Sequence, residues 1–142
     1  MFISDINVLV YARRPDSPHH DACRRFVEEM ANGFEPFGLP HATESGFVRL
    51  VTDRRVFNFP TTMAEALGFI DVLRESPAYR TVLPGSGHWR IFSELCLSAN
   101  VHGNLVPDAY LAALAIEADA ELVSCDRDFA RCPGLRWMNP AK

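Results

Sequence analysis

The sequence predicts an α/β protein, a three-layer α/β/α sandwich built around a mostly parallel central sheet. Short apolar segments alternate with helical patterns of about 10–15 residues, which is the spacing of strand–helix–strand units. Two apolar segments also end directly in an acidic residue, as strands do at the ligand-binding edge of such a sheet. The chain of 142 residues has no linker-like segment, so we expect one domain over residues 1–142.

The first predicted strand covers residues 2–4 and ends at Asp5, and a short buried helix follows over residues 6–13. A carboxylate in such an apolar stretch costs free energy to bury unless it has a partner. Asp5 therefore either caps the helix that begins after it, or presents its carboxylate to a ligand at the carboxyl edge of the sheet.

The next predicted elements are a helix over residues 19–31, a strand over 36–39 and a helix over 41–52. We place Ala22, Phe26 and Met30 on the buried face of the first of these helices. Glu44 shares the apolar face of the second, because it precedes Phe47 by three residues. A carboxylate on that face either meets a positive partner or interacts with the dipole at the helix N-terminus.

The second half of the chain continues the alternation. Thr61 or Thr62 caps a helix that ends near residue 75, and Glu65 is placed to complete a capping box with Thr62. We then expect a strand over 79–83, a helix over 88–101, an Ala-rich helix over 107–118, a strand over 121–125 and an edge strand over 135–138. Asp108 heads the buried face of the Ala-rich helix, and Asp126 ends the strand that follows it.

Composition excludes several classes of function. The net charge of −4 argues against a general nucleic-acid binder, and Lys142 is the only lysine, so a catalytic lysine is excluded. The chain has no signal-peptide pattern and no apolar run of the roughly 20 residues that cross a bilayer, so we expect a soluble, cytoplasmic protein. The cysteines are scattered and predict small buried side chains rather than disulfides or a zinc site: Cys23, Cys96, Cys125 and Cys132.

Four acids are predicted at one edge of the sheet, because the carboxyl ends of parallel strands meet there. They are Asp5, Glu44, Asp108 and Asp126. Crowded carboxylates repel one another and stay partly protonated unless a cation lies among them. Oxygen ligands alone favour Mg²⁺ or Mn²⁺, and such ions activate water against phosphodiesters. The pattern therefore predicts a metal site.

The chain resembles the PIN domain and, more narrowly, the VapC-type toxin ribonucleases of toxin–antitoxin modules. The resemblance covers nearly the whole chain and rests on Asp5-x-Asn7-Val8-Leu9, a lone Glu44, Gly103-Asn104-x-x-x-Asp108-Ala109, Ser124-x-Asp126-x-Asp128-Phe129 and Trp137-x-Asn139-Pro140. It implies a PIN-like nuclease domain that is a Mg²⁺- or Mn²⁺-dependent endoribonuclease and hydrolyses RNA through an activated water. It also implies a homodimer and neutralisation by a small VapB-like antitoxin laid across the active-site groove.

The resemblance assigns roles to individual residues. Asp5 and Asp108 become direct metal ligands, Asp126 a direct or water-mediated ligand, and Glu44 a residue that holds water beside the ion. Supporting roles fall to Asn7, Ser124 and Asp128. Many family members have Thr directly after the first Asp, whereas this chain has Ile6 and so lacks that hydroxyl.

RNA binding by an acidic protein needs local positive charge. Six arginines lie near the predicted carboxyl edge and either form a basic rim or are ordinary solvated side chains: Arg13, Arg14, Arg49, Arg54, Arg55 and Arg127. Phe57 and Phe59 either stack on unpaired bases or pack in the core or a dimer interface. Two other functions remain open, a non-catalytic PIN-fold binding module and a phosphatase-type domain. The latter typically needs a second Asp at position 7 or a lysine near the site.

Overall fold

Strand β1 (Phe2–Ser4) lies at the centre of a five-stranded sheet in a computed structural model that describes residues 1–142. Its neighbours are β2 (Phe37–Gly38) on one side and β4 (Glu121–Val123) on the other. The edges are β3 (Tyr79–Arg80) and β5 (Arg136–Met138), which gives the order β3-β2-β1-β4-β5. Every pair of neighbouring strands is parallel, so all the strands end at the same edge of the sheet.

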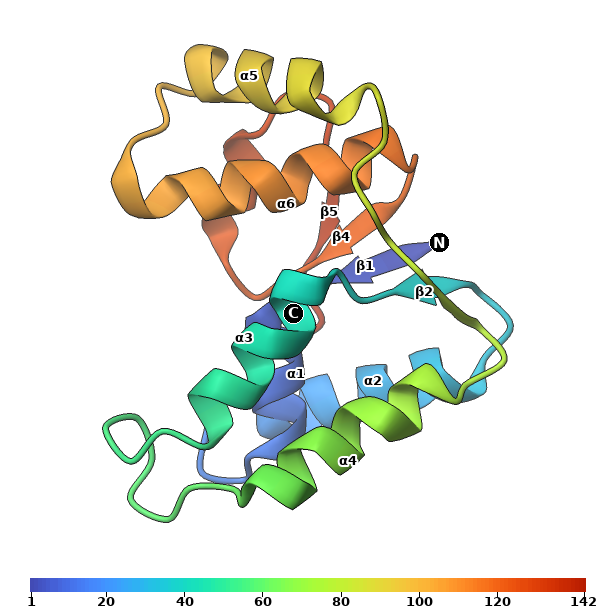
Figure 1. The fold of residues 1–142 in the computed structure, drawn as a ribbon, viewed down its shortest axis with the longest axis vertical. Coiled ribbons are helices and arrows are strands. Elements are labelled where there is room, and N and C mark those ends of the chain that lie inside the picture. The colour runs from blue at the N-terminus through green and yellow to red at the C-terminus, as the bar shows by residue number, and fades with distance from the viewer.

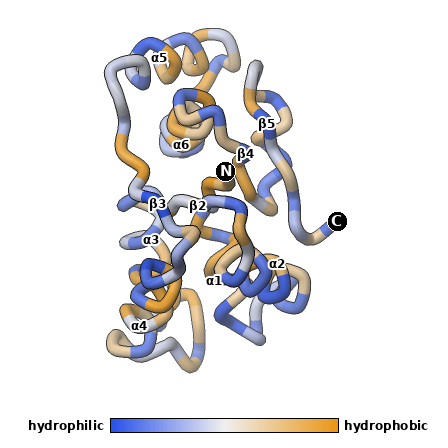
Figure 2. The backbone as a smooth tube through the Cα atoms, turned by 90° about the vertical axis from the view of Figure 1, so that its right-hand side faces the viewer, coloured by the Kyte–Doolittle hydropathy of each residue, from blue (hydrophilic) through white to orange (hydrophobic).

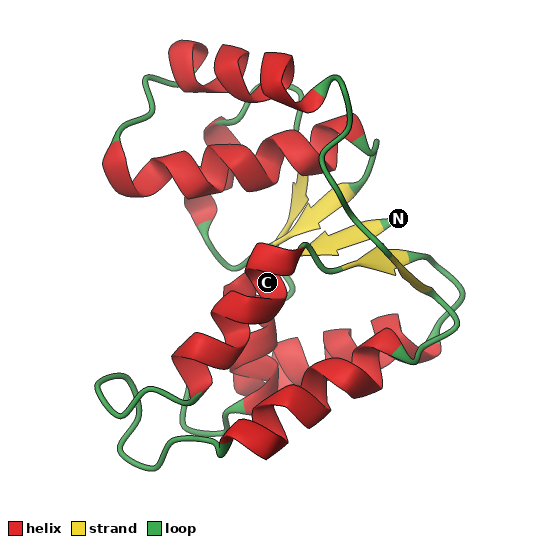
Figure 3. Cartoon of the chain, viewed as in Figure 1, coloured by secondary structure: helices red, strands yellow, loops and turns green.

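Helices cover both faces of this sheet, as Figure 1 shows. One layer contains α1 (Ile6–Arg13), α2 (His20–Asn32), α3 (His41–Val51) and α4 (Met63–Arg74), and the other contains α5 (His88–Ser98) and α6 (Val106–Glu117). Two short 3₁₀ helices, Gly103–Leu105 and Arg127–Arg131, precede α6 and follow β4 (Figure 3). The predicted three-layer α/β/α sandwich is confirmed, with a sheet that is entirely parallel.

Each face of the sheet has its own hydrophobic core, because successive strand residues point to opposite faces. Ile3 and Leu122 belong to the core beneath α5 and α6, whereas Val123 and Phe37 belong to the core beneath α1–α4. Figure 2 shows the orange, hydrophobic segments of β4 and α1 inside the molecule and the blue, hydrophilic turns of α2 on its outside. The central strands therefore anchor both helical layers.

Several local predictions need correction. The strands are shorter than expected, because β2 and β3 have two residues each. Pro40, two residues after the end of β2, is already the N-cap of α3. On α2 the fully buried stripe is Cys23, Val27 and Met30, while Phe26 sits at its border, edge-on to Phe2. The 3₁₀ helix after β4 was not predicted. None of the helices has the length and apolar character that a membrane crossing requires.

Candidate active site

Asp5 directly follows the central strand, and its backbone and its side chain make different hydrogen bonds. Its N–H donates to the carbonyl of Val123 at 2.9 Å and so extends the pairing of β1 with β4. Its Oδ1 accepts a hydrogen bond from the N–H of Ile6 at 2.7 Å and caps α1. One oxygen thus performs the capping role that the sequence left open, and the other, Oδ2, accepts from Asn7 on α1 and from Ser124, the residue after β4.

A polar network holds Oδ2 of Asp5. The Ser124 hydroxyl donates to it at 2.8 Å, and the Asn7 side-chain amide donates to it at 3.1 Å. Ser124 Oγ also accepts from Asn7 Nδ2 at 3.2 Å and from the N–H of Asp126 at 3.0 Å. The two strand-end acids, Asp5 and Asp126, are therefore positioned by one shared hydroxyl.

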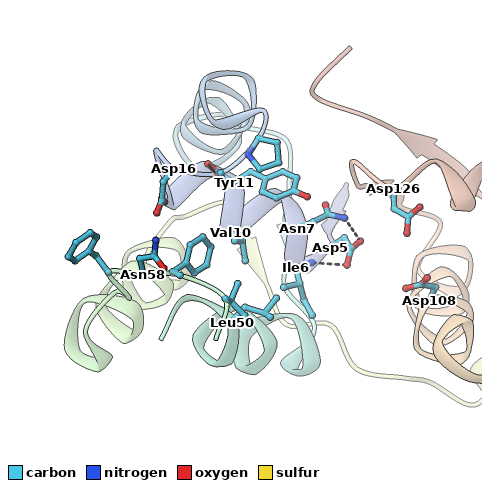
Figure 4. Close-up of a pocket in the computed structure, with 15 residues that line it drawn as sticks. Asp5, Ile6, Asn7, Val10, Tyr11, Asp16, Leu50, Asn58, Asp108 and Asp126 are labelled. Atoms are coloured by element: carbon cyan, nitrogen blue, oxygen red, sulfur yellow. Dashed lines mark hydrogen bonds between the residues drawn. The ribbon is translucent and has the colours of Figure 1, made fainter. Parts of the chain in front are cut away.

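Asp108, in the first turn of α6, faces the same space, which Figure 4 shows with Asp5 and Asp126 around it. Burial, together with the negative charges of Asp5, Asp126 and Asp128, raises the pKa of Asp108 to about 6, and burial is the larger cause. The pKa of Asp5 is also raised, chiefly by burial, with the charge of Asp126 adding to it. Asp5, Asp108 and Asp126 form no ion pair with any basic side chain. These three carboxylates are called the acidic cluster below.

Glu44 does not join the acidic cluster. Its carboxylate accepts hydrogen bonds from Arg74 at 2.7 and 2.9 Å and from the Tyr79 hydroxyl at 2.9 Å. Arg74 ends α4 and Tyr79 lies on β3, an edge strand, whereas Asp126 follows β4 on the other side of β1. Of the four predicted acids, three therefore face the same space, and Glu44 forms an ion pair with Arg74 instead.

The predicted basic rim is smaller than six residues. Arg14 is buried, where its guanidinium pairs with Asp16, donates to the carbonyl of Phe59 at 2.8 Å and lies 4.2 Å from the Phe57 ring centroid. Arg13 pairs with Glu65 and Arg55 with Asp53. Among these six, the exposed arginines with no carboxylate partner are Arg49, Arg54 and Arg127. Arg127 directly follows Asp126, and the supporting acid Asp128 pairs with Arg131.

A groove of about 870 Å³ extends from the acidic cluster along α1 to the loop that joins α3 and α4 (Figure 4). Its walls include Tyr11, Phe57, Asn58 and Phe59, so both phenylalanines left open by the sequence line this groove, at its end away from the acidic cluster (Figure 4). Phe57 also packs against the core beneath α1–α4. Phe59 is 85% exposed. Tyr11 was missed from the sequence, although it follows Asn7 by four residues on a helix and so shares its face.

Ile6, which stands where many family members have Thr, packs against Gly46 of α3. A Cβ atom built on Gly46 would lie 2.4 Å from Ile6 Cδ1, closer than side chains approach one another. Gly46 thus leaves the space that the Ile6 side chain fills beside Asp5. The sequence carried no sign of this pairing, because 40 residues separate the two positions.

The donor set suits a hard divalent cation. The acidic cluster offers surplus negative charge and oxygen ligands, which Mg²⁺ and Mn²⁺ prefer. No three histidine, cysteine or acidic side chains close around a single point. Mg²⁺ keeps several of its own waters and needs only one or two direct carboxylates, so an open cluster fits it better than a closed cage.

Comparison with known proteins identifies the family. A model of the PIN domain matches residues 3–135. The chain belongs to the PIN domain family. This PIN domain is 44% identical over 140 residues to VapC ribonuclease Mb2897 of Mycobacterium bovis, covering 99% of this chain and 95% of that one. It is 37% identical over 140 residues to ribonuclease VapC25 of Mycobacterium tuberculosis, with 99% of both chains covered.

Solved structures share the fold of this PIN domain. VapBC2 from Rickettsia felis, bound to a DNA fragment from its promoter, superposes with a TM-score of 0.70 at 18% identity, covering 97% of each chain. VapBC-1 from nontypeable Haemophilus influenzae superposes with a TM-score of 0.67 at 16% identity, covering 99% of this chain and 98% of that one. At these identities the likeness establishes the fold alone.

Proposed function

We propose that this PIN domain is a Mg²⁺- or Mn²⁺-dependent endoribonuclease and the toxin of a toxin–antitoxin module. The observation that carries the proposal is the acidic cluster, three mutually repelling carboxylates without a basic partner at the mouth of a large groove. The relatives that are 37–44% identical are named ribonucleases, which supports RNA as the substrate.

In this proposal Asp5, Asp108 and Asp126 hold the ion, while Asn7 and Ser124 keep Asp5 in place. A bound Mg²⁺ or Mn²⁺ would lower the pKa of a water, orient it and stabilise the leaving oxygen of the phosphodiester. Glu44 has no part in the proposed ion site, because Arg74 and Tyr79 already occupy its carboxylate.

The groove would hold a single-stranded segment of RNA. Tyr11, Phe57 and Phe59 offer aromatic surface on which unpaired bases stack. Arg49, Arg54 and Arg127 offer guanidinium groups for phosphates, and the first two lie beside groove-lining segments in the sequence. Loop contacts of this kind position a strand without naming its base sequence.

The direct test compares the purified wild-type protein with Asp108→Asn on single-stranded RNA in Mg²⁺, Mn²⁺ or EDTA. We expect cleavage by the wild type with metal only, and a loss of at least about 100-fold in the variant, as for removal of an essential charged group. Asp71→Asn, an exposed carboxylate on α4, is the matched control and should cleave like the wild type. RNA binding without cleavage by the wild type would instead favour the non-catalytic binding module.

We propose two protein partners. The 44% identical relative is named a VapC ribonuclease, and the structural neighbours are named VapBC2 and VapBC-1, which supports a VapB-like antitoxin that covers the groove in the cytoplasm. A basic side chain of the antitoxin would complement the acidic cluster. A second copy of this chain is the other partner, supported by large apolar side chains exposed on α5 and α6, which include Trp89 and Leu97.

A further inference from the structure

Two thiols meet next to the acidic cluster. The Sγ atoms of Cys23, on α2, and Cys125, which directly follows Ser124, are 3.6 Å apart although 102 residues separate them in the chain. All four cysteines are free, and Cys96 and Cys132 make no comparable sulfur contact. Cys23 is fully buried, whereas Cys125 is half-buried and so open to small reagents.

We propose that Cys23 and Cys125 close to an intramolecular disulfide when the protein meets a hydroperoxide. The sulfur atoms are already in contact, and the bonded separation of about 2.05 Å is reached if each moves by less than about 1 Å. The pair joins α2 to the segment between β4 and Asp126. Disulfides in reducing compartments are usually transient and redox-sensing, which is the role assigned to this pair.

The reaction balances with hydrogen peroxide as the two-electron oxidant. The half-buried Cys125 sulfur attacks one peroxide oxygen, the O–O bond breaks, and a sulfenic acid and one water form. The Cys23 sulfur then attacks the Cys125 sulfur, the S–S bond forms and the S–O bond breaks, and the hydroxyl leaves as a second water with the remaining thiol proton. Two thiols are oxidised and one peroxide is reduced.

The disulfide would also disturb the acidic cluster, a consequence that rests on the proposed function. The Cys125 N–H donates to Asn7 Oδ1 at 3.1 Å, and its two chain neighbours are Ser124 and Asp126. Drawing Cys125 towards α2 shifts the segment that positions Asp5 and Asp126. Displacements of about 1 Å in a catalytic arrangement cost up to roughly 100-fold in rate, so oxidation should slow RNA cleavage.

The test uses a Cys96→Ala/Cys132→Ala background, because the tryptic peptide 91–127 contains Cys96 as well as Cys125. The reduced protein is treated with hydrogen peroxide, alkylated in denaturant and analysed by mass spectrometry. We expect a monomer about 2 Da lighter, with no free thiols and with peptide 14–24 linked to peptide 91–127, reversed by dithiothreitol. Adding Cys23→Ala should abolish the link and leave Cys125 open to alkylation or overoxidation.

The proposal is overturned if the peroxide-treated background protein keeps two free thiols, if it links only between molecules, or if Cys125 stops at a sulfinic acid while Cys23 remains reduced. None of these measurements depends on nuclease activity. A second arm compares RNA cleavage before and after oxidation, where we expect a reversible fall of about tenfold or more. An unchanged rate overturns the coupling to the acidic cluster, whereas inactivity of the reduced protein would count against the proposed function alone.

Discussion

At Asp108, burial and three neighbouring negative charges all favour the protonated carboxyl group, which explains why its pKa reaches about 6 from an ordinary 3.8. The folded protein therefore binds a proton at Asp108 more tightly than the unfolded chain does. As the pH rises from 3.8 through about 6, the folded state loses stability relative to the unfolded state, and it does not regain it at higher pH. The ionised Asp108 is a stability cost that a bound cation would offset.

This cost makes a prediction for Asp108→Asn in metal-free buffer. Above pH 6 the free energy of unfolding of the variant should exceed that of the wild type by about 1 kcal/mol, after allowance for solvent screening. Below about pH 3 the two proteins should be equally stable, because Asp108 is then protonated in both the folded and the unfolded state. Urea unfolding across this pH range measures the difference, and a variant that is less stable at neutral pH would contradict the raised pKa.

Ser124 provides a second prediction at the residue scale. Ser124→Ala removes the donor to Asp5 Oδ2 and the acceptor for the N–H of Asp126, so both acids lose their shared support. We expect Mn²⁺ to bind about 10-fold more weakly, as when outer groups around metal ligands are removed, which calorimetry can measure. Ser93→Ala, on the exposed surface of α5, is the control and should bind Mn²⁺ like the wild type. Unchanged affinity in Ser124→Ala would show that Asp5 needs no such support.

At the scale of elements, capping chemistry made several helix starts predictable. Thr62 accepts from the N–H of Glu65, Pro107 lies in the first turn of α6, and α1 begins directly after Asp5. Strand lengths were not predictable in the same way, because pairing partners set them: β3 needs β2, which has only two residues. The 3₁₀ helix after β4 depends on Asp126 Oδ1, which accepts from the N–H of Asp128.

The grouping of Asp5, Asp108 and Asp126 around one groove was predictable, because acids that end strands or begin buried helix faces lie at one edge of a parallel sheet. Periodicity also placed Glu44 on the inward face of its helix, but it could not identify which side chain of another element contacts Glu44. Arg74 is 30 residues away in the chain, and only the fold brings the end of α4 to the start of α3.

Glu44→Gln tests the assignment of this side chain to the contact between α3, α4 and β3. Because Arg74 is partly exposed, we expect a loss of about 1 kcal/mol in the free energy of unfolding. RNA cleavage per folded molecule should stay within about twofold of the wild type, since the acidic cluster is untouched. An Arg74→Gln variant should also be less stable than the wild type, because it removes the other half of the same ion pair. A large fall in cleavage by Glu44→Gln with unchanged stability would place Glu44 in the metal site after all.

At the scale of the whole molecule, the metal binding proposed for the uncompensated acidic cluster would be linked to folding. Saturation of a site that only the folded chain possesses stabilises it by about 2.7 kcal/mol at a ligand concentration 100 times the Kd. Millimolar Mn²⁺ should therefore raise the Tm by several degrees, and EDTA should reverse the change. Asp5→Asn should abolish the shift, whereas Asp71→Asn should keep it. A shift of equal size in both variants would indicate binding elsewhere on the surface.

The exposed apolar side chains of α5, in the layer formed by α5 and α6, predict the site of self-association. Trp89 and Leu97 on α5 are 73% and 84% exposed, and Tyr110 of α6 lies near Phe92 in the same aromatic group. Trp89→Glu should convert a dimer to a monomer at micromolar concentration in light scattering, because it would bury a charge in the interface. Val72→Glu, on exposed surface of the opposite layer, should leave the dimer intact. Dissociation by both variants would exclude α5 as the interface.

The place of β1 in the middle of the sheet has a consequence for the order of events during synthesis. Asp5 is synthesised before the hydroxyl that supports it, which belongs to Ser124, 119 residues later. A ribosome must therefore add all the residues between these two positions before the two halves of the candidate centre can meet. Until then the nascent chain carries Asp5 without Ser124 and Asp126, so the proposed nuclease centre is incomplete while these residues are being added.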